Sequence, residues 1–149
     1  MERTYIMLKP DCVERGLIGE VIPRIERKGY QITSMKMMHL DEPILREHYA
    51  HLVNEDFFPL LVDFMMSGPV VAMIVEGEDC IAGMRRLMGP TNNANAAPGT
   101  IRGDLACSNR LNIIHGSDSP ESAAREIGIF FKPEELVDYT KDSNKWLYE

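Results

Sequence analysis

One histidine, His115, stands in a context suited to nucleophilic chemistry. The Gly116-Ser117-Asp118-Ser119 run follows it, between an expected strand and an expected helix. Gly116 permits a tight turn, so the imidazole would project from a sheet edge. A neutral imidazole is a nucleophile when an acceptor holds its N–H, and Glu126 could do so directly or through Ser117. A single turn histidine is more often structural, so His115 alone leaves both roles open.

Three cations, Lys9, Arg85 and Arg102, fall at expected element ends or loops rather than on continuous helix faces. Phosphoryl transfer spreads negative charge over the phosphate oxygens, so it requires positive charge and hydrogen-bond donors from the protein. Thr91 and Asn112 could add neutral donors. No Walker-type glycine loop occurs, so any phosphate site must use side chains. An isolated Lys or Arg is usually a solvated surface charge, which stays the alternative for each.

Aromatic residues and two further histidines occur between residues 43 and 66. Phe58 is expected in the core, whereas Phe57 could either pack there or stack on a nucleotide base, because adjacent helical residues do not share a face. His48 and His51 are spaced i, i+3 and could touch one metal ion. Without a third ligand nearby, both are expected to be surface histidines.

The elements that must position these groups alternate in type. Strands are expected over residues 3–8, 30–40, 69–76 and 112–115, and helices over 17–28, 43–52, 59–66, 80–88 and 120–127. Pro23 predicts a kink or a late start in the first helix, since it removes one backbone hydrogen bond. Ser119 is the expected N-cap of the last helix, with Pro120 at its first position. Residues 91–103 are expected to form a long functional loop.

This order predicts an α/β (α+β) fold of the ferredoxin-like, split βαβ type. It would contain a four-stranded antiparallel sheet with flanking helices and a helical hairpin insertion. The chain has 149 residues and no repeat, low-complexity tract or linker, so a single domain over residues 1–149 is expected. Such a layout serves enzymes and binding modules alike, so it leaves the function open.

Composition limits the classes of partner. The formal charge of −7 argues against a general affinity for duplex DNA or anionic membranes, although a local basic cluster can still bind phosphate. Three widely spaced cysteines show neither a zinc pattern nor a disulfide framework. The longest apolar run, residues 70–75, is too short to span a bilayer, and no signal peptide is recognisable. A soluble, cytoplasmic protein with reduced thiols is expected.

Four segments together closely resemble the nucleoside diphosphate kinase family, over essentially the whole chain. They are Lys9-Pro10-Asp11, Ser67-Gly68-Pro69-Val70-Val71-Ala72-Met73, Pro98-Gly99-Thr100-Ile101-Arg102-Gly103-Asp104 and Asn112-Ile113-Ile114-His115-Gly116-Ser117-Asp118-Ser119. The last segment is that family's signature, and the four together favour a catalytic role for His115.

The resemblance implies ping-pong transfer of the terminal phosphate of a nucleoside triphosphate, such as ATP, to a nucleoside diphosphate. It implies His115 as the nucleophile, phosphorylated at the pros nitrogen, with Lys9 in the catalytic group and Glu126 and Ser117 as orienting partners. Groups that hold phosphates or the sugar hydroxyl are implied at Lys9, Tyr49, Arg85, Thr91, Arg102 and Asn112, and base stacking at Phe57.

Cofactor and assembly are implied in the same way. Mg²⁺ bridges the nucleotide phosphates in the family largely without direct protein ligands, which suits a sequence lacking a carboxylate cluster at metal spacing. The tail Trp146-Leu147-Tyr148-Glu149 resembles that of hexameric members, so a homohexamer is expected, with a tetramer as the alternative. No stable nucleic-acid or membrane partner is expected.

Three positions depart from the family pattern. Cys12 replaces a small residue, Arg110-Leu111 stands where Gly-Arg is common, and Asn93 replaces a proline. None removes a chemical group. Cys12 beside Lys9 could have a lowered pKa and react more readily, but an inert thiol is expected.

Two other classes of function remain to be tested. A ferredoxin-like module could bind nucleotides or single-stranded nucleic acid without chemistry, although the acidic charge and the absence of paired strand aromatics weigh against nucleic acid. A regulatory histidine phosphoprotein would need phosphate from a partner kinase. Lys9, Arg85 and Arg102 instead suggest that the chain binds its own phosphate donor.

Overall fold

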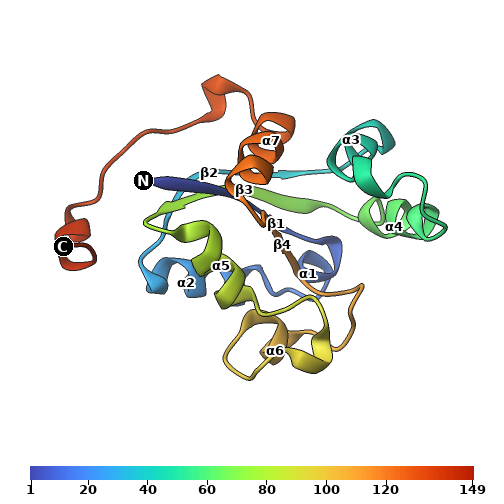
Figure 1. Cartoon of the computed structure of the whole chain (residues 1–149), viewed down its shortest axis with the longest axis horizontal. Coiled ribbons are helices and arrows are strands. Elements are labelled where there is room, and N and C mark those ends of the chain that lie inside the picture. The colour runs from blue at the N-terminus through green and yellow to red at the C-terminus, as the bar shows by residue number, and fades with distance from the viewer.

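The computed structural model describes residues 1–149 and contains one four-stranded antiparallel sheet in the order β2-β3-β1-β4 (Figure 1). The strands are β1 Glu2–Leu8, β2 Gln31–Met38, β3 Val70–Gly77 and β4 Ile114–Gly116. The central strands β1 and β3 are almost wholly buried, because helices cover both faces of the sheet. The predicted ferredoxin-like fold class is confirmed.

Seven α-helices surround the sheet. They are α1 Pro10–Glu14, α2 Ile18–Lys28, α3 Glu42–His48, α4 Phe58–Met65, α5 Cys80–Met88, α6 Ile101–Leu105 and α7 Pro120–Phe130. Short 3-10 helices occupy Ala50–Leu52, Asn93–Asn95, Pro133–Glu135 and Asp142–Trp146. None of the helices combines the length and apolar character needed to cross a membrane.

The alternation of side chains along β1 divides the interior into two cores. Ile6 and Leu8 face a core that includes residues of α2 and α5. Tyr5 and Met7 face the opposite core, to which α3, α4 and α7 contribute. The helical hairpin α3–α4 therefore lies on the same side of the sheet as α7 (Figure 1).

Two local predictions differ from the structure, and one short helix was not predicted. Pro23 lies inside a helix that starts at Ile18, so the late start is wrong, whereas the kink stays a prediction. Residues 9–11 open the short helix α1, with Pro10 at its first position. Residues 91–103 are not one irregular loop, because Thr100 caps α6 by accepting a hydrogen bond from the Gly103 N–H.

Candidate active site

His115 lies in the short edge strand β4, directly opposite Met7 of β1. Its neighbour Gly116 has no room for a side chain, since an added Cβ would stand 2.6 Å from the Met88 sulfur. The next helix, α7, begins as predicted, with the Ser119 hydroxyl accepting from the Ser122 N–H and Pro120 in the first turn. Strand and helix together fix the imidazole at the end of the sheet.

The residue two positions earlier, Ile113, has a φ of 76°, a left-handed conformation that is rare for a β-branched side chain. The Ile114 N–H donates to the Asn112 carbonyl over 2.8 Å, which closes a three-residue turn. The Ile113 N–H donates to Asp11 Oδ2 at 3.0 Å, and its carbonyl accepts from the Lys9 N–H at 2.9 Å. Contacts from α1 and its N-cap thus hold the strained turn.

Glu126 of α7 contacts His115 directly, one of the two arrangements expected. The pair is Glu126 Oε1 with His115 Nε2, so the other ring nitrogen, Nδ1, is free of this contact. Ser117 does not bridge them, because its hydroxyl lies with the Tyr5 main chain, 3.4 Å from the nitrogen and 3.5 Å from the oxygen. It joins the turn after β4 to β1.

The electrostatics favour a neutral imidazole. Burial lowers the pKa of His115 from its ordinary value, and the charges of Lys9 and Arg85 lower it further, whereas Glu126 opposes both effects. At neutral pH the ring therefore keeps one proton. With Nε2 donating to the carboxylate, Nδ1 carries the lone pair.

His48 corrects a prediction made from the sequence. Its side chain is only 2% exposed, and its ring centroid lies 4.8 Å from that of His115. His48 Nδ1 lies 3.8 Å from Glu126 Oε1, so the third group that the sequence lacked comes from α7. Burial lowers the pKa of His48 to about 2. The available sequence signal was its i, i+3 spacing from the buried Leu45.

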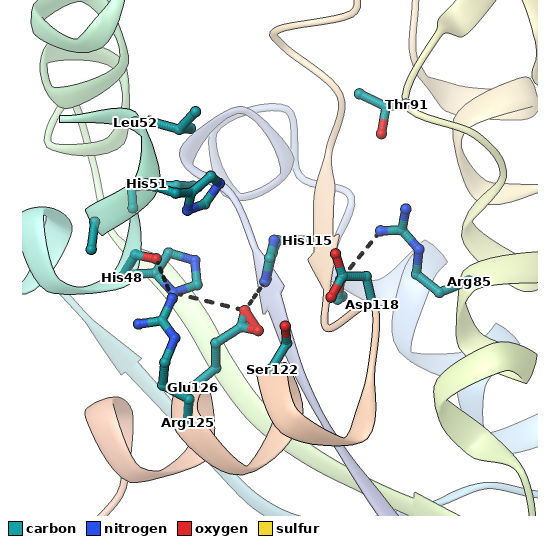
Figure 2. Close-up of a pocket in the computed structure, with 13 residues that line it drawn as sticks. His48, His51, Leu52, Arg85, Thr91, His115, Asp118, Ser122, Arg125 and Glu126 are labelled. Carbon is teal, nitrogen blue, oxygen red and sulfur yellow. Dashed lines mark hydrogen bonds and ion pairs between the residues drawn. The ribbon is translucent and has the colours of Figure 1, made fainter. Parts of the chain in front are cut away.

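A cavity of about 770 Å³ opens in front of His115, between the hairpin and α5 (Figure 2). Its polar lining includes His48, Tyr49, His51, Arg85, Thr91, His115, Asp118, Ser122, Arg125 and Glu126. Arg85 Nη1 donates to the Gly116 carbonyl at 3.2 Å, which leaves other guanidinium donors for a ligand. The pKa of Asp118 is lowered, mainly by a hydrogen bond from Ser122 and also by the charge of Arg85.

Lys9, Arg102 and Asn112 form a hydrogen-bonded group at the Ile113 turn. Lys9 Nζ donates to Asn112 Oδ1 at 2.7 Å. Arg102 is 3% exposed and donates to the main-chain carbonyls of Asn112 at 3.2 Å, Gly89 at 2.9 Å and Ile114 at 2.6 Å. The guanidinium of Arg102, which was expected to bind phosphate, therefore holds the main chain on both sides of Ile113. None of the three side chains lines the cavity.

Burial also lowers the pKa of the two cations in this group, Lys9 and Arg102. The pKa of Lys9 falls to about 8, through burial first and the charge of Arg102 second. The pKa of Arg102 falls to about 10, through burial and the charge of Arg85. Lys9 is therefore the cation whose charge changes closest to neutral pH.

The adjacent residues Phe57 and Phe58 differ in burial, as expected for neighbours that do not share a helix face. Phe58 is buried in the core, which confirms its prediction, while Phe57 is 48% exposed at the N-cap of α4. Tyr49 lines the cavity and packs edge-on against His48 with ring centroids 4.5 Å apart. Base stacking by Phe57, which lies outside the cavity lining, stays a prediction.

Two of the unusual positions have clear surroundings. Cys12 is buried, and burial raises the pKa of its thiol to about 12, which agrees with the expectation of an inert thiol. The Asn93 N–H donates to Asn109 Oδ1 at 2.7 Å, a bond that the proline usual there could not make. Arg110 and Leu111 are exposed.

Comparison with known proteins agrees with this arrangement. A family model described as nucleoside diphosphate kinase matches residues 2–136. A nucleoside diphosphate kinase of Desulforamulus reducens is 54% identical over the full length of both chains. The human nucleoside diphosphate kinase A is 53% identical over 148 residues, which cover 99% of this chain and 97% of the human one.

The fold comparison is equally close. A halophilic nucleoside diphosphate kinase from Halobacterium salinarum, solved in complex with CDP, superposes with a TM-score of 0.96 at 48% identity. The alignment covers 99% of each chain. This chain therefore belongs to the nucleoside diphosphate kinase family and is a phosphotransferase that acts on nucleotides.

Proposed function

We propose that the terminal phosphate passes from donor to acceptor through a covalent adduct on His115 Nδ1. The observation that carries this proposal is the direct contact of Nε2 with Glu126 beside an open cavity. That contact supports an imidazole whose remaining nitrogen, Nδ1, has a free lone pair.

In the first half-reaction the Nδ1 lone pair attacks the terminal phosphorus of a nucleoside triphosphate. An N–P bond forms as the bond from phosphorus to the bridging oxygen breaks, and the nucleoside diphosphate leaves with that electron pair. The proton on Nε2 stays in its hydrogen bond to Glu126, whose negative charge offsets the positive charge that develops on the ring. An acceptor diphosphate then reverses these steps.

The cations around His115 support a single phosphate site that serves donor and acceptor in turn. Arg85 and Thr91 line the cavity, and we assign them to the phosphates. Lys9 and Asn112 donate to the transferred group, while Arg102, in addition to its carbonyl contacts, offers remaining guanidinium donors. Ser117 positions the turn through Tyr5.

We assign the sugar and the base to the hairpin side of the cavity. Tyr49 lies at the cavity wall, where its hydroxyl can meet the sugar. Phe57 offers an exposed ring face for stacking, which does not discriminate strongly between bases.

The donor set of the cavity fits a magnesium ion that arrives with the nucleotide. Only two carboxylates, Asp118 and Glu126, line it, and Glu126 is already in contact with His115, so no protein cage of oxygen ligands exists there. Mg²⁺ brought in by the nucleotide would supply positive charge that offsets the negative charge of the phosphates. Arg85 and Lys9 would neutralise the remainder.

We further propose that residues 1–149 act as one domain in a cytoplasmic homohexamer, with a tetramer as the alternative. The continuous sheet supports one domain, the three free cysteines support a reducing compartment, and the exposed Trp146 supports burial of the tail in an assembly. The ligands are ATP and other nucleoside tri- and diphosphates, as the CDP complex of the Halobacterium salinarum relative suggests. Nucleic acid and membranes are not proposed as stable partners.

The decisive experiment supplies Mg²⁺ and γ-phosphate-labelled ATP without any acceptor. We expect label on the protein that is labile in acid and stable in base, as for phosphohistidine, and that maps to His115. Adding a nucleoside diphosphate should release the label as triphosphate, with ping-pong kinetics. His115→Ala should lose labelling and turnover together.

Three results would contradict this mechanism. Nucleotide binding without label would favour a binding module, and label only with a second protein would favour a regulatory phosphoprotein. Substantial turnover by His115→Ala would remove His115 from the reaction.

A further inference from the structure

We assign His48 no role in the transfer reaction, yet it is buried and lines the active-site cavity. Neither of its ring nitrogens has a hydrogen-bond partner, although both are inaccessible to solvent. A buried polar atom without a partner destabilises the fold and requires an explanation. Nδ1 of His48 lies 3.8 Å from the Glu126 carboxylate that also contacts His115, which suggests that the three groups share a ligand.

We propose that His48, His115 and Glu126 bind Zn²⁺ or a similar transition-metal ion, and that the bound ion holds the phosphotransferase in an inactive state. One ligand atom from each residue lies within 4.8 Å of the others. Tetrahedral ligands with bonds of about 2.1 Å stand about 3.4 Å apart, so side-chain shifts of roughly 1.4 Å at most would complete the site. The loss of activity rests on the proposed role of His115, whereas ion binding does not.

The donor chemistry selects the class of ion. Two imidazole nitrogens and one carboxylate are a ligand set found at zinc sites that keep a fourth position open. Here the cavity can supply water to that position. Imidazole favours Zn²⁺, Cu²⁺ and Ni²⁺, whereas Mg²⁺ prefers oxygen ligands. The site is therefore chemically distinct from the magnesium ion that accompanies the nucleotide.

Burial of the two histidines favours metal binding at this site, whereas nearby positive charge opposes it. Burial keeps both histidines in the neutral form that binds metals, since it lowers the pKa of His48 to about 2 and that of His115 below its ordinary value. Lys9, Arg85 and Arg125 bring positive charge close to the two rings. We therefore expect reversible binding that EDTA removes.

Arg125 also prepares the geometry. Its guanidinium donates to the main-chain carbonyls of Glu47 and His48, both at 2.9 Å. Figure 2 shows the contact between Arg125 and His48. These bonds fix the C-terminal end of α3 against α7, so His48 is held close to Glu126 before any ion enters. A preorganised ligand set loses less conformational entropy when it binds.

Inactivation follows from the proton on the His115 ring. In the free protein the proton is on Nε2 and the lone pair is on Nδ1. An ion bound to Nε2 takes the place of that proton, which moves to Nδ1 and occupies the lone pair needed for attack. Conversely, an N–P bond at Nδ1 leaves the Nε2 proton with Glu126. The ion and the phosphoryl group thus exclude each other.

The test uses Co²⁺, whose visible absorption reports coordination without any measure of activity. Wild-type protein without nucleotide should show Co²⁺ bands that Zn²⁺ removes by displacement. His48→Gln and Glu126→Gln should each weaken Co²⁺ binding by at least about tenfold, since loss even of second-shell partners weakens metal binding by 10- to 100-fold. His51→Gln should retain the bands, and His39→Gln, outside the cavity, should retain both the bands and phosphotransfer.

Phosphorylation supplies the second arm of the test. Protein phosphorylated in advance should show no Co²⁺ bands, and Zn²⁺ added before ATP should prevent labelling of His115 until EDTA is added. Unchanged Co²⁺ affinity in a folded His48→Gln variant would overturn the proposal, as would tight binding by the phosphorylated protein. Loss of binding in Cys107→Ser would also overturn it, because the exposed thiol of Cys107 would then be the ligand. Should His48→Gln not fold, Glu126→Gln and His115→Gln decide in the same way.

The two arms separate this proposal from the proposed function. Co²⁺ bands that depend on His48 and Glu126, in a protein that never labels, would support the metal site and reject the phosphohistidine. Labelling at His115 without Co²⁺ bands would do the reverse.

Discussion

The side chains of the candidate site form two groups that differ in how the protein holds them. The framework, defined as Lys9, Arg102, Asn112 and Glu126, is joined to the main chain or to other side chains by hydrogen bonds. The rim, defined as His51, Phe57 and Thr91, is exposed, and its side chains make no hydrogen bond within the protein. Framework residues therefore fix the geometry of the site, whereas the side chains of rim residues are free to contact a ligand.

This difference predicts which property each substitution changes. A framework substitution should alter stability together with the rate of phosphate transfer or the affinity for phosphate, because it disturbs the turn that carries His115. A rim substitution should alter nucleotide affinity and leave stability almost unchanged. Four measurements can break or sharpen this division, in order of decreasing effect.

Arg102→Lys should have the largest effect, although it keeps the charge. An ammonium cannot reproduce the three bonds to main-chain carbonyls, so we expect a loss of about 2–4 kcal/mol in the free energy of unfolding and about 100-fold in transfer rate. Urea denaturation and single-turnover labelling measure the two effects. Arg110→Lys is the matched control, since Arg110 is exposed and its side chain makes no hydrogen bond. A stable but slow Arg102→Lys variant would show that its guanidinium acts on phosphate alone.

Glu126→Gln should slow phosphorylation of His115 by about tenfold, because a neutral amide stabilises the charged ring less than a carboxylate does. Rapid-quench labelling with ATP measures this step. Glu121→Gln, an exposed substitution on the same helix, should label at the wild-type rate. Equal rates for both variants would exclude Glu126 from the reaction.

Nucleotide affinity should fall by about tenfold as the pH rises through 8, since the pKa of Lys9 is about 8 and its charge is lost above that value. Titration with a diphosphate between pH 7 and 9.5 tests this, and Lys9→Arg should remove the dependence. The stability effect has the opposite sign. The unfolded chain keeps the proton up to the ordinary pKa of 10.5, so this group adds stability as the pH rises from about 8 to 10.5. A pH-independent affinity in the wild type would place Lys9 outside the binding site.

Phe57→Ala should have the smallest effect, a loss of about fivefold in affinity for every base, with an unchanged free energy of unfolding. Phe58→Ala is the matched contrast, because removing a buried ring should destabilise the protein by about 3–5 kcal/mol. A loss confined to purines or to pyrimidines would mean that Phe57 does not act by stacking alone.

Local signals in the sequence were sufficient for most of the fold. The helix α5 has the predicted bounds, and α7 begins at the predicted cap, because both depend on neighbouring residues. The helices α1 and α6 have five residues each, which is too short for a helical period to be recognised. They were therefore missed or assigned to a loop.

The site was predicted less evenly than the fold. The contact of Glu126 with His115 could be anticipated because one strand end and one helix turn join them. His48 had only its i, i+3 spacing from Leu45 as a signal, since its burial depends on α7, almost eighty residues further along. The contacts of Arg102 depend on where three separate carbonyls meet, and no local pattern encodes that. Long-range packing decides which polar groups become framework and which become rim.

The left-handed backbone of Ile113 has a consequence for the thermodynamics of turnover. Folding supplies the free energy that keeps this turn closed, through Asp11, Lys9 and Arg102, before any nucleotide arrives. Because the turn is already ordered, no conformational entropy is lost in each catalytic cycle to order the nucleophile.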